Sequence, residues 1–113
     1  YHVYQLFTAG TETTAYTIGV TVHELLRQPQ SWERLGREPA LVEAACEEGL
    51  RYASAIRHDF RTVTRPAELP GQPLAAGDRV IGSLESANRD ERVYAEPGRF
   101  ALDRREAAKA LLA

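Results

Sequence analysis

The sequence is poor in the residues that mark several common protein classes. It has a single cysteine, Cys46, which excludes an intramolecular disulfide. Cys46 is expected to be a small, buried or half-buried hydrophobic residue of a helix. Its three histidines are scattered, without the spacing of metal ligands, so no metal site is predicted. No run of eighteen apolar residues predicts a membrane span. The formal net charge of −2 gives no reason to expect nucleic acid or an anionic membrane as a partner. Methionine is also absent, and the first residues are already in helical rhythm, which indicates a piece of a longer protein. Without a secretory signal, the expected location is cytoplasmic.

The 113 residues predict one mainly α-helical unit with a small β portion, an α+β class. Apolar residues at helical spacing predict a long helix over residues 1–28. Pro29 ends it and opens a second helix over 29–38, and Pro39 starts a third over 39–52. Residues 53–87 read as a β region, with strands at 60–64 and 79–84 and turns at Pro66, Pro70–Gly71, Pro73 and 76–78. Residues 88–104 predict an ordered irregular loop, and 105–113 a helix-prone tail.

The stretch Ala9-Gly10-Thr11-Glu12-Thr13-Thr14 is poor helix design inside the first helix. Gly10 costs about 1 kcal/mol relative to alanine in a helix interior. The threonine hydroxyls can bond to the carbonyl four residues earlier and bend the helix. A buried helix that accepts these costs is expected to leave room for something flat, with a proton donor beside it.

Glu48 and Arg51 form a second chemical signal, because residues three apart share one face of a helix. One interpretation is a surface ion pair, which contributes about 0.2–0.5 kcal/mol. The other is a buried pair completed by a third group, since a desolvated pair is favourable only when its remaining donors and acceptors are satisfied. Arg99 is the candidate for this third member, with its guanidinium on the Glu48 carboxylate.

Four motifs then occur in one order: Ala9-Gly10-x-Glu12-Thr13-Thr14, Glu48-x-x-Arg51, Ala87-Asn88-Arg89-Asp90 and Pro97-x-Arg99-Phe100. This order resembles that of the bacterial cytochrome P-450 proteins, the haem-thiolate monooxygenases. The resemblance covers residues 1–104. It implies that 1–28 is like the I helix of that family, 29–38 like the J helix, 39–52 like the K helix and 88–104 like its meander.

The resemblance also implies roles for single residues. Ala9 and Gly10 would be small because haem and bound dioxygen lie against them. Thr13 would hydrogen-bond the dioxygen and help deliver protons, and Glu12 would supply or relay those protons. Arg61 would bind a haem propionate. Glu48, Arg51 and Arg99 would form the family's structural triad, which is not catalytic. The alternative for Thr13 is a helix-face threonine bonded to its own backbone, and for Arg61 a surface arginine at the start of a strand.

The sequence departs from the family pattern at its end. The glycine-rich loop whose cysteine ligates the haem iron is absent from the 113 residues, and Cys46 lacks the context to replace it. Gly49 stands where a larger apolar residue is usual, and Glu91 where proline is usual. Arg57-His58-Asp59 makes a segment that borders the substrate in the family unusually polar, which fits a polar substrate, an eroded pocket or a solvated turn.

Two functions and one inactive state follow from the resemblance. The first is a part of a bacterial monooxygenase that inserts one oxygen atom into a small organic substrate in secondary metabolism, with haem as cofactor and electrons from a ferredoxin-type redox partner. The second is an auxiliary relative that lacks the haem cysteine and activates a partner such as a glycosyltransferase. The third is a remnant without activity. The 113 residues alone are not expected to bind haem through a thiolate.

Overall fold

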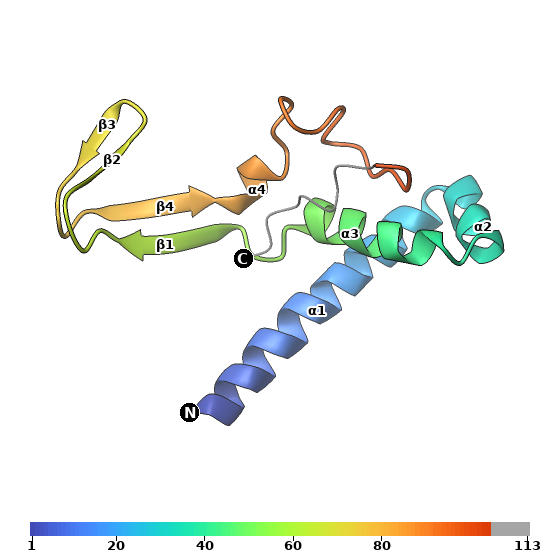
Figure 1. Cartoon of the computed structure of the whole chain (residues 1–113). Coiled ribbons are helices and arrows are strands. Elements are labelled where there is room, and N and C mark those ends of the chain that lie inside the picture. The colour runs from blue at the N-terminus through green and yellow to red at the C-terminus, as the bar shows by residue number, and fades with distance from the viewer. Residues whose placement is uncertain (105–113) are drawn as a thin grey trace.

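The computed structural model describes residues 1–104, so the predicted helix-prone tail at 105–113 lies outside the described residues. The described chain is helical with a small β portion, which confirms the predicted fold class (Figure 1). The helices are α1 (His2–Leu26), α2 (Pro29–Arg37), α3 (Leu41–Ala53) and the short α4 (Leu84–Ala87). The strands are β1 (His58–Thr62), β2 (Ala67–Leu69), β3 (Gln72–Leu74) and β4 (Arg79–Ser83).

The three long helices lie within two residues of their predicted bounds at each end. Pro29 is the first residue of α2, a position where its fixed φ angle suits a helix and its missing N–H costs nothing. The third helix begins at Leu41 rather than at Pro39, because residues 38–42 first form a turn with i to i+3 hydrogen bonds. Helix α3 ends at Ala53, and the residue that caps it, Ser54, is left-handed with a φ of 43° and a ψ of 57°.

The β region consists of two antiparallel pairs, β1 with β4 and β2 with β3. Strand β1 begins at His58, two residues earlier than predicted, and its register pairs Asp59 with Gly82 and Arg61 with Val80. Pro70 and Gly71 form the turn between β2 and β3, and the φ of 80° at Gly71 is one that glycine adopts without strain. Pro73 was predicted at a turn, but it lies within β3.

The core lies where the C-terminal end of α1, α3 and the irregular loop meet. It consists of Leu25, Ala45, Phe100 and Leu102, with Leu35 and Tyr52 packed against it. Leu25 is the only buried residue of α1 within the described chain. The expectation that α1 is a buried helix is therefore wrong for residues 1–104, since its apolar residues Val3, Phe7 and Ile18 are exposed. Figure 1 shows the N-terminal half of α1 running away from α3.

Residues 88–104 contain turns and bends but neither helix nor strand, as predicted for an ordered irregular loop. We call this segment the 88–104 loop. It packs on α3 through Phe100 and Leu102, and a hydrogen bond from Gln28 to the Phe100 carbonyl joins it to the start of α2. In Figure 1 it leaves α4 and returns along α3, which brings its polar groups over the Glu48 side of that helix.

Candidate functional site

Threonines of α1 form a repeating set of side-chain to backbone hydrogen bonds. The Oγ1 atom of Thr13 donates to the carbonyl of Ala9 at 2.7 Å, Thr17 donates to Thr13 at 2.9 Å, and Thr21 donates to Thr17 at 2.7 Å. The backbone bond foreseen as the alternative for Thr13 is therefore present. Because a hydroxyl has one donor hydrogen and two acceptor lone pairs, the lone pairs of Thr13 Oγ1 are left for another group.

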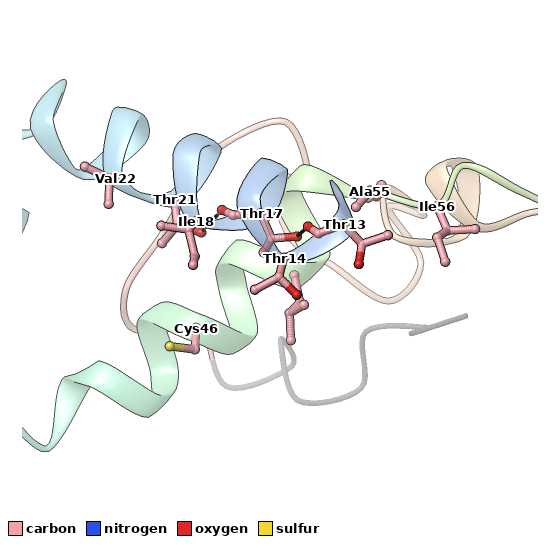
Figure 2. Close-up of a pocket in the computed structure, with 11 residues that line it drawn as sticks. Thr13, Thr14, Thr17, Ile18, Thr21, Val22, Cys46, Ala55 and Ile56 are labelled. Carbon is pink, nitrogen blue, oxygen red and sulfur yellow. Dashed lines mark hydrogen bonds between the residues drawn. The ribbon is translucent and has the colours of Figure 1, made fainter. Parts of the chain in front are cut away.

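The same threonines line a groove of about 490 Å³ between α1 and α3, which we call the α1–α3 groove (Figure 2). Its α3 side includes Cys46 and Leu50. The expectation that Cys46 is buried or half-buried is wrong, because it is exposed in the described chain. The groove is mostly apolar with hydroxyl groups along one wall, and it is lined by Thr13, Thr14, Thr17, Ile18, Thr21, Val22, Cys46, Leu50, Ser54, Ala55 and Ile56.

The small residues before Thr13 leave open space on α1. A Cβ atom placed on Gly10 would meet no other heavy atom within 4 Å. Ala9 and Glu12 are exposed, and the carboxylate of Glu12 makes no hydrogen bond or ion pair with any residue in 1–104. This part of α1 can therefore accept a flat group against the backbone, with an acid and a hydroxyl in adjacent positions.

Arg61 lies in β1 with its side chain largely exposed. Its guanidinium contacts the carboxylate of Asp59, two residues earlier on the same face of the strand, and donates to the Phe60 carbonyl at 3.2 Å. It was expected at the start of the strand, but it lies near the end. Its exposure leaves it accessible to a further carboxylate, with Asp59 as an internal competitor.

Glu48 and Arg51 form a fully buried ion pair, with both side chains 0% exposed. Arg51 Nε donates to Glu48 Oε2 at 2.7 Å and Nη2 to Glu48 Oε1 at 2.9 Å, the bidentate geometry that a guanidinium allows. Nη1 donates to the carbonyls of Asn88 and Pro97, and Nη2 also to that of Arg99. All five N–H groups of Arg51 are thereby used. The buried interpretation of this pair is confirmed.

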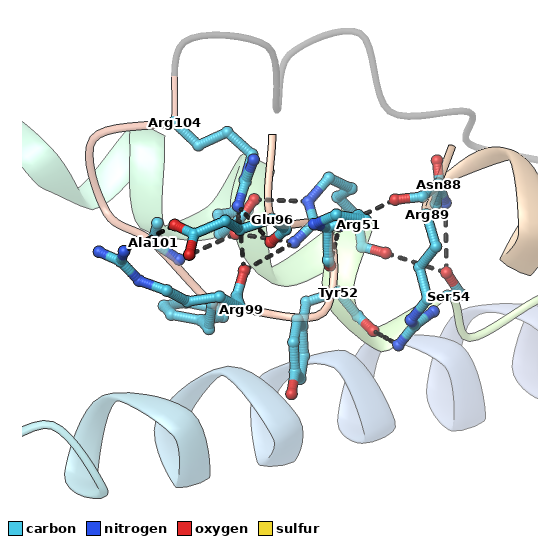
Figure 3. Close-up of polar contacts among 12 residues, drawn as sticks. Arg51, Tyr52, Ser54, Asn88, Arg89, Glu96, Arg99, Ala101 and Arg104 are labelled. Atoms are coloured by element: carbon cyan, nitrogen blue, oxygen red, sulfur yellow. Dashed lines mark hydrogen bonds and ion pairs between the residues drawn. The ribbon is translucent and has the colours of Figure 1, made fainter. Parts of the chain in front are cut away.

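The second cation on Glu48, and so the third member of the cluster, is Arg104, whereas the sequence predicted Arg99. Arg104 Nε donates to Glu48 Oε1 at 3.0 Å, and its side chain is 5% exposed (Figure 3). The Arg99 side chain is 62% exposed and pairs with Glu96 at 3.1 Å. The reason is the path of the loop, which turns the Arg99 side chain outward and leaves only its backbone carbonyl facing Arg51.

The Asn88–Arg89 motif holds the loop to the end of α3. Asn88 is buried and donates from Nδ2 to Ser54 Oγ at 3.3 Å. Arg89 donates to the Tyr52 carbonyl at 3.0 Å, and its guanidinium lies 5.5 Å from the centre of the Tyr52 ring. Arg51 also lies over the Tyr94 ring, at 5.3 Å. The guanidinium groups of Arg51 and Arg89 thus hold the loop in place through hydrogen bonds to backbone carbonyls and through contacts with aromatic rings.

Asp90, the last residue of this motif, is paired with Arg92 at the surface. Arg92 donates to the Asp90 carboxylate from its side chain and from its backbone N–H at 2.9 Å. These hydrogen bonds to the charged form hold the pKa of Asp90 at about 2, below its usual 3.8. The same pairing raises the pKa of Arg92. This pair lies at a turn of the loop.

Helix α3 has two faces with different neighbours. Cys46 and Leu50 face the α1–α3 groove that Thr13 lines, while Glu48 and Arg51 face the 88–104 loop.

No cluster of three or more His, Cys, Asp or Glu side chains that could hold a metal ion occurs among residues 1–104. No helix in the same range is long and apolar enough to cross a membrane.

Arg104 was missed because it follows the last recognised motif. A signal for it exists in the sequence, since Phe100 and Leu102 are apolar at alternate positions and Arg104 continues their spacing. In the structure Phe100 and Leu102 are buried with the Arg104 side chain, while Arg99 and Asp103 are exposed. Burial of every second residue, a pattern typical of extended chain, therefore indicates that Arg104 points inward.

Comparisons with known proteins agree in sequence and in structure. The sequence model of the Cytochrome P-450 family matches residues 1–110. Cytochrome P-450 CYP199A2 of Rhodopseudomonas palustris is 39% identical over 103 residues, which cover 91% of this chain and 25% of that protein. Linalool 8-monooxygenase of Pseudomonas putida is 39% identical over 95 residues, covering 84% of this chain and 23% of that protein.

Among solved structures, cytochrome P-450-153 from Novosphingobium aromaticivorans has a TM-score of 0.85 and 38% sequence identity. The alignment covers 94% of this chain and 27% of that structure. The chain thus spans about a quarter of the length of the relatives it matches.

Proposed function

Because the chain belongs to the cytochrome P-450 family, we propose that the complete protein is a haem-thiolate monooxygenase acting on a small organic substrate. Relatives named as monooxygenases, including the linalool 8-monooxygenase, support this reaction class. In this proposal α1, α2 and α3 correspond to the I, J and K helices and the 88–104 loop to the meander. The proposal includes bacterial secondary metabolism, a cytoplasmic location and electrons from a ferredoxin-type partner.

The observation that carries the proposal is Thr13, with its acidic neighbour, on the open part of α1. Its hydroxyl faces a groove, and the helix surface one turn earlier is formed by Ala9 and Gly10. A structural threonine would need neither the adjacent acid nor the open glycine. The combination suits a site where a proton must reach an oxygen atom held against the helix.

The residues present fit the haem group on the side of α1 and β1. Haem, when bound, supplies the redox chemistry that activates dioxygen. Ala9 and Gly10 would form the flat contact, since a Cβ on Gly10 would meet no atom within 4 Å. Arg61 would hold a propionate, because its exposed guanidinium already binds one carboxylate, that of Asp59. The iron's thiolate ligand is not assigned to any residue of this chain.

The chain's own contribution to the reaction is the handling of protons. Thr13 Oγ1 donates to the Ala9 carbonyl, so its lone pairs can accept a hydrogen bond from the groove. Rotation of the hydroxyl redirects its hydrogen toward the groove and gives up one hydrogen bond, at a net cost of about 0.5–1.5 kcal/mol. The Glu12 side chain is exposed to solvent. In this proposal Glu12 is the group that relays a proton from solvent toward Thr13 Oγ1.

The test is the replacement of Thr13 by alanine in the complete protein. We expect Thr13→Ala to lower the amount of product formed per electron pair consumed and to raise the hydrogen peroxide released, while Thr13→Ser keeps most of the coupling. Thr17→Ala is the matched control. Thr17 lies four residues after Thr13, and its hydroxyl makes the same kind of hydrogen bond, to the Thr13 carbonyl. Unchanged coupling in Thr13→Ala would contradict the proposed role.

A further inference from the structure

We infer that Arg104, and not Arg99, is the positioning residue that anchors the 88–104 loop to the buried Glu48 and so sets where the following chain leaves this fold. The motif Pro97-x-Arg99-Phe100 points to Arg99, so this assignment comes from the geometry alone. It rests on the proposed function only in the statement that the following chain supplies the iron ligand.

The Glu48 carboxylate is the fixed point of the loop. It accepts four hydrogen bonds within the described chain, two from Arg51, one from the Ala101 backbone N–H at 2.9 Å and one from Arg104 Nε at 3.0 Å. Three of these four converge on Oε1. Arg104 is therefore the only side chain of the 88–104 loop that reaches this carboxylate, since Ala101 contributes its backbone.

The two terminal nitrogen atoms of the Arg104 guanidinium bind backbone carbonyls of the same loop. Nη1 donates to the Ala95 carbonyl at 2.6 Å, and Nη2 donates to the carbonyls of Glu96 and Arg99 at 3.2 and 3.1 Å. These carbonyls belong to a turn without helix or strand partners. A planar fork with several donors can satisfy them together with the carboxylate, which a lysine ammonium cannot do in the same geometry (Figure 3).

Arg99 contributes to the same cluster through its backbone and not through its side chain. Its backbone carbonyl accepts from Arg51 at 3.2 Å and from Arg104 at 3.1 Å. Its side chain forms an exposed pair with Glu96, of the kind that adds little to stability. Replacement of the Arg99 side chain should leave the cluster intact, which makes position 99 a matched control for position 104.

The experiment compares Arg104→Lys, Arg104→Gln and Arg99→Gln in the complete protein. The first readout is hydrogen exchange at the Ala101 amide and its neighbours. We expect Arg104→Gln to speed this exchange by about tenfold or more, because a buried charge-assisted hydrogen bond is lost. Arg104→Lys should lie between it and the wild type, and Arg99→Gln should match the wild type.

The second readout is the share of haem that keeps its thiolate ligand in the reduced carbon monoxide complex. This share should fall in Arg104→Gln and Arg104→Lys and stay unchanged in Arg99→Gln. If Arg104→Gln does not fold while Arg99→Gln does, the anchoring role is supported. The carbon monoxide spectrum is then measured on Arg104→Lys instead. Equal effects at positions 99 and 104, or wild-type exchange in both Arg104 variants, would overturn the assignment of Arg104. A wild-type share of thiolate-ligated haem in folded Arg104 variants would overturn its link to the ligand.

Failure of the proposed function would look different. A wild-type protein that binds no haem overturns the monooxygenase proposal, whereas the exchange at Ala101 still tests Arg104, because it depends only on contacts among the described residues.

Discussion

A Cβ atom added to Gly49 would lie 2.0 Å from Oγ1 of Thr21, so α1 and α3 approach each other at a point where only glycine fits. Thr21 is itself held by its hydrogen bond to the Thr17 carbonyl. The glycine that departs from the usual family pattern is therefore explained by the threonine opposite it.

This contact predicts that Gly49→Ala destabilises the complete protein. Overpacking costs about 1–3 kcal/mol, and the helix regains about 1 kcal/mol from alanine, which leaves a net loss of up to about 2 kcal/mol in the free energy of unfolding. Denaturant unfolding measures this change. Gly19→Ala is the control, because a Cβ there meets nothing within 4 Å and should be neutral or stabilising. Adding Thr21→Ala to Gly49→Ala should restore part of the loss, and no recovery would contradict the packing explanation.

Arg51→Lys tests the buried ion pair. The ammonium cannot reproduce five hydrogen bonds from a planar fork to one carboxylate and three carbonyls. We expect a loss of about 3 kcal/mol in the free energy of unfolding, at the lower end of the range for a broken buried pair. The control is Arg92→Lys, since the Arg92 side chain is exposed. Equal unfolding midpoints for the two variants would show that the buried fork is dispensable.

Asp90 gives a prediction for pH dependence. Its pKa in the folded chain is about 2 and its ordinary value is 3.8. Because the folded pKa is lower, the pairing with Arg92 stabilises the fold above pH 3.8, and this stabilisation is lost as the pH falls from 3.8 toward 2. A carboxyl titration followed by NMR should give a midpoint near the lower value, and Arg92→Gln should return it toward the ordinary one. A normal midpoint in the wild type would contradict the pairing.

Asp59 and Arg61 give a prediction about cofactor retention in the complete protein. If Arg61 binds a propionate, Asp59 competes for the same guanidinium. Exposed pairs contribute about 0.2–1 kcal/mol, so Asp59→Asn should slow the transfer of haem to an acceptor protein by up to about fivefold. Arg61→Gln should speed the transfer. Faster loss in both variants would instead mean that Asp59 holds Arg61 in place.

The helices were predictable because their limits are local. Pro29 fixes one start through its own φ angle, and the apolar spacing up to Leu26 fixes the preceding helix. Strand β1 was placed two residues late because His58 and Asp59 carry no strand signal of their own. Their extension comes from pairing with Ser83 and Gly82, which are distant in the sequence. Pro73 is tolerated in β3 because a two-stranded pair has open edges that need no N–H.

The site was predictable where a motif fixes it and not where the chain path does. Glu48 and Arg51 are three apart on one helix, so their contact follows from helix geometry. The choice between Arg99 and Arg104 depends on how an irregular loop turns, which neither propensity nor periodicity of a regular element determines. The exposure of α1 could not be predicted either, because the burial of a helix face depends on which segments surround it.

The most direct test of the proposed function is a carbon monoxide difference spectrum of the reduced, complete protein. The haem-thiolate monooxygenase proposal predicts the long-wavelength absorption band of a thiolate-ligated haem, with one haem bound per chain. A complete protein that binds no haem, or whose haem lacks a thiolate ligand, would contradict it.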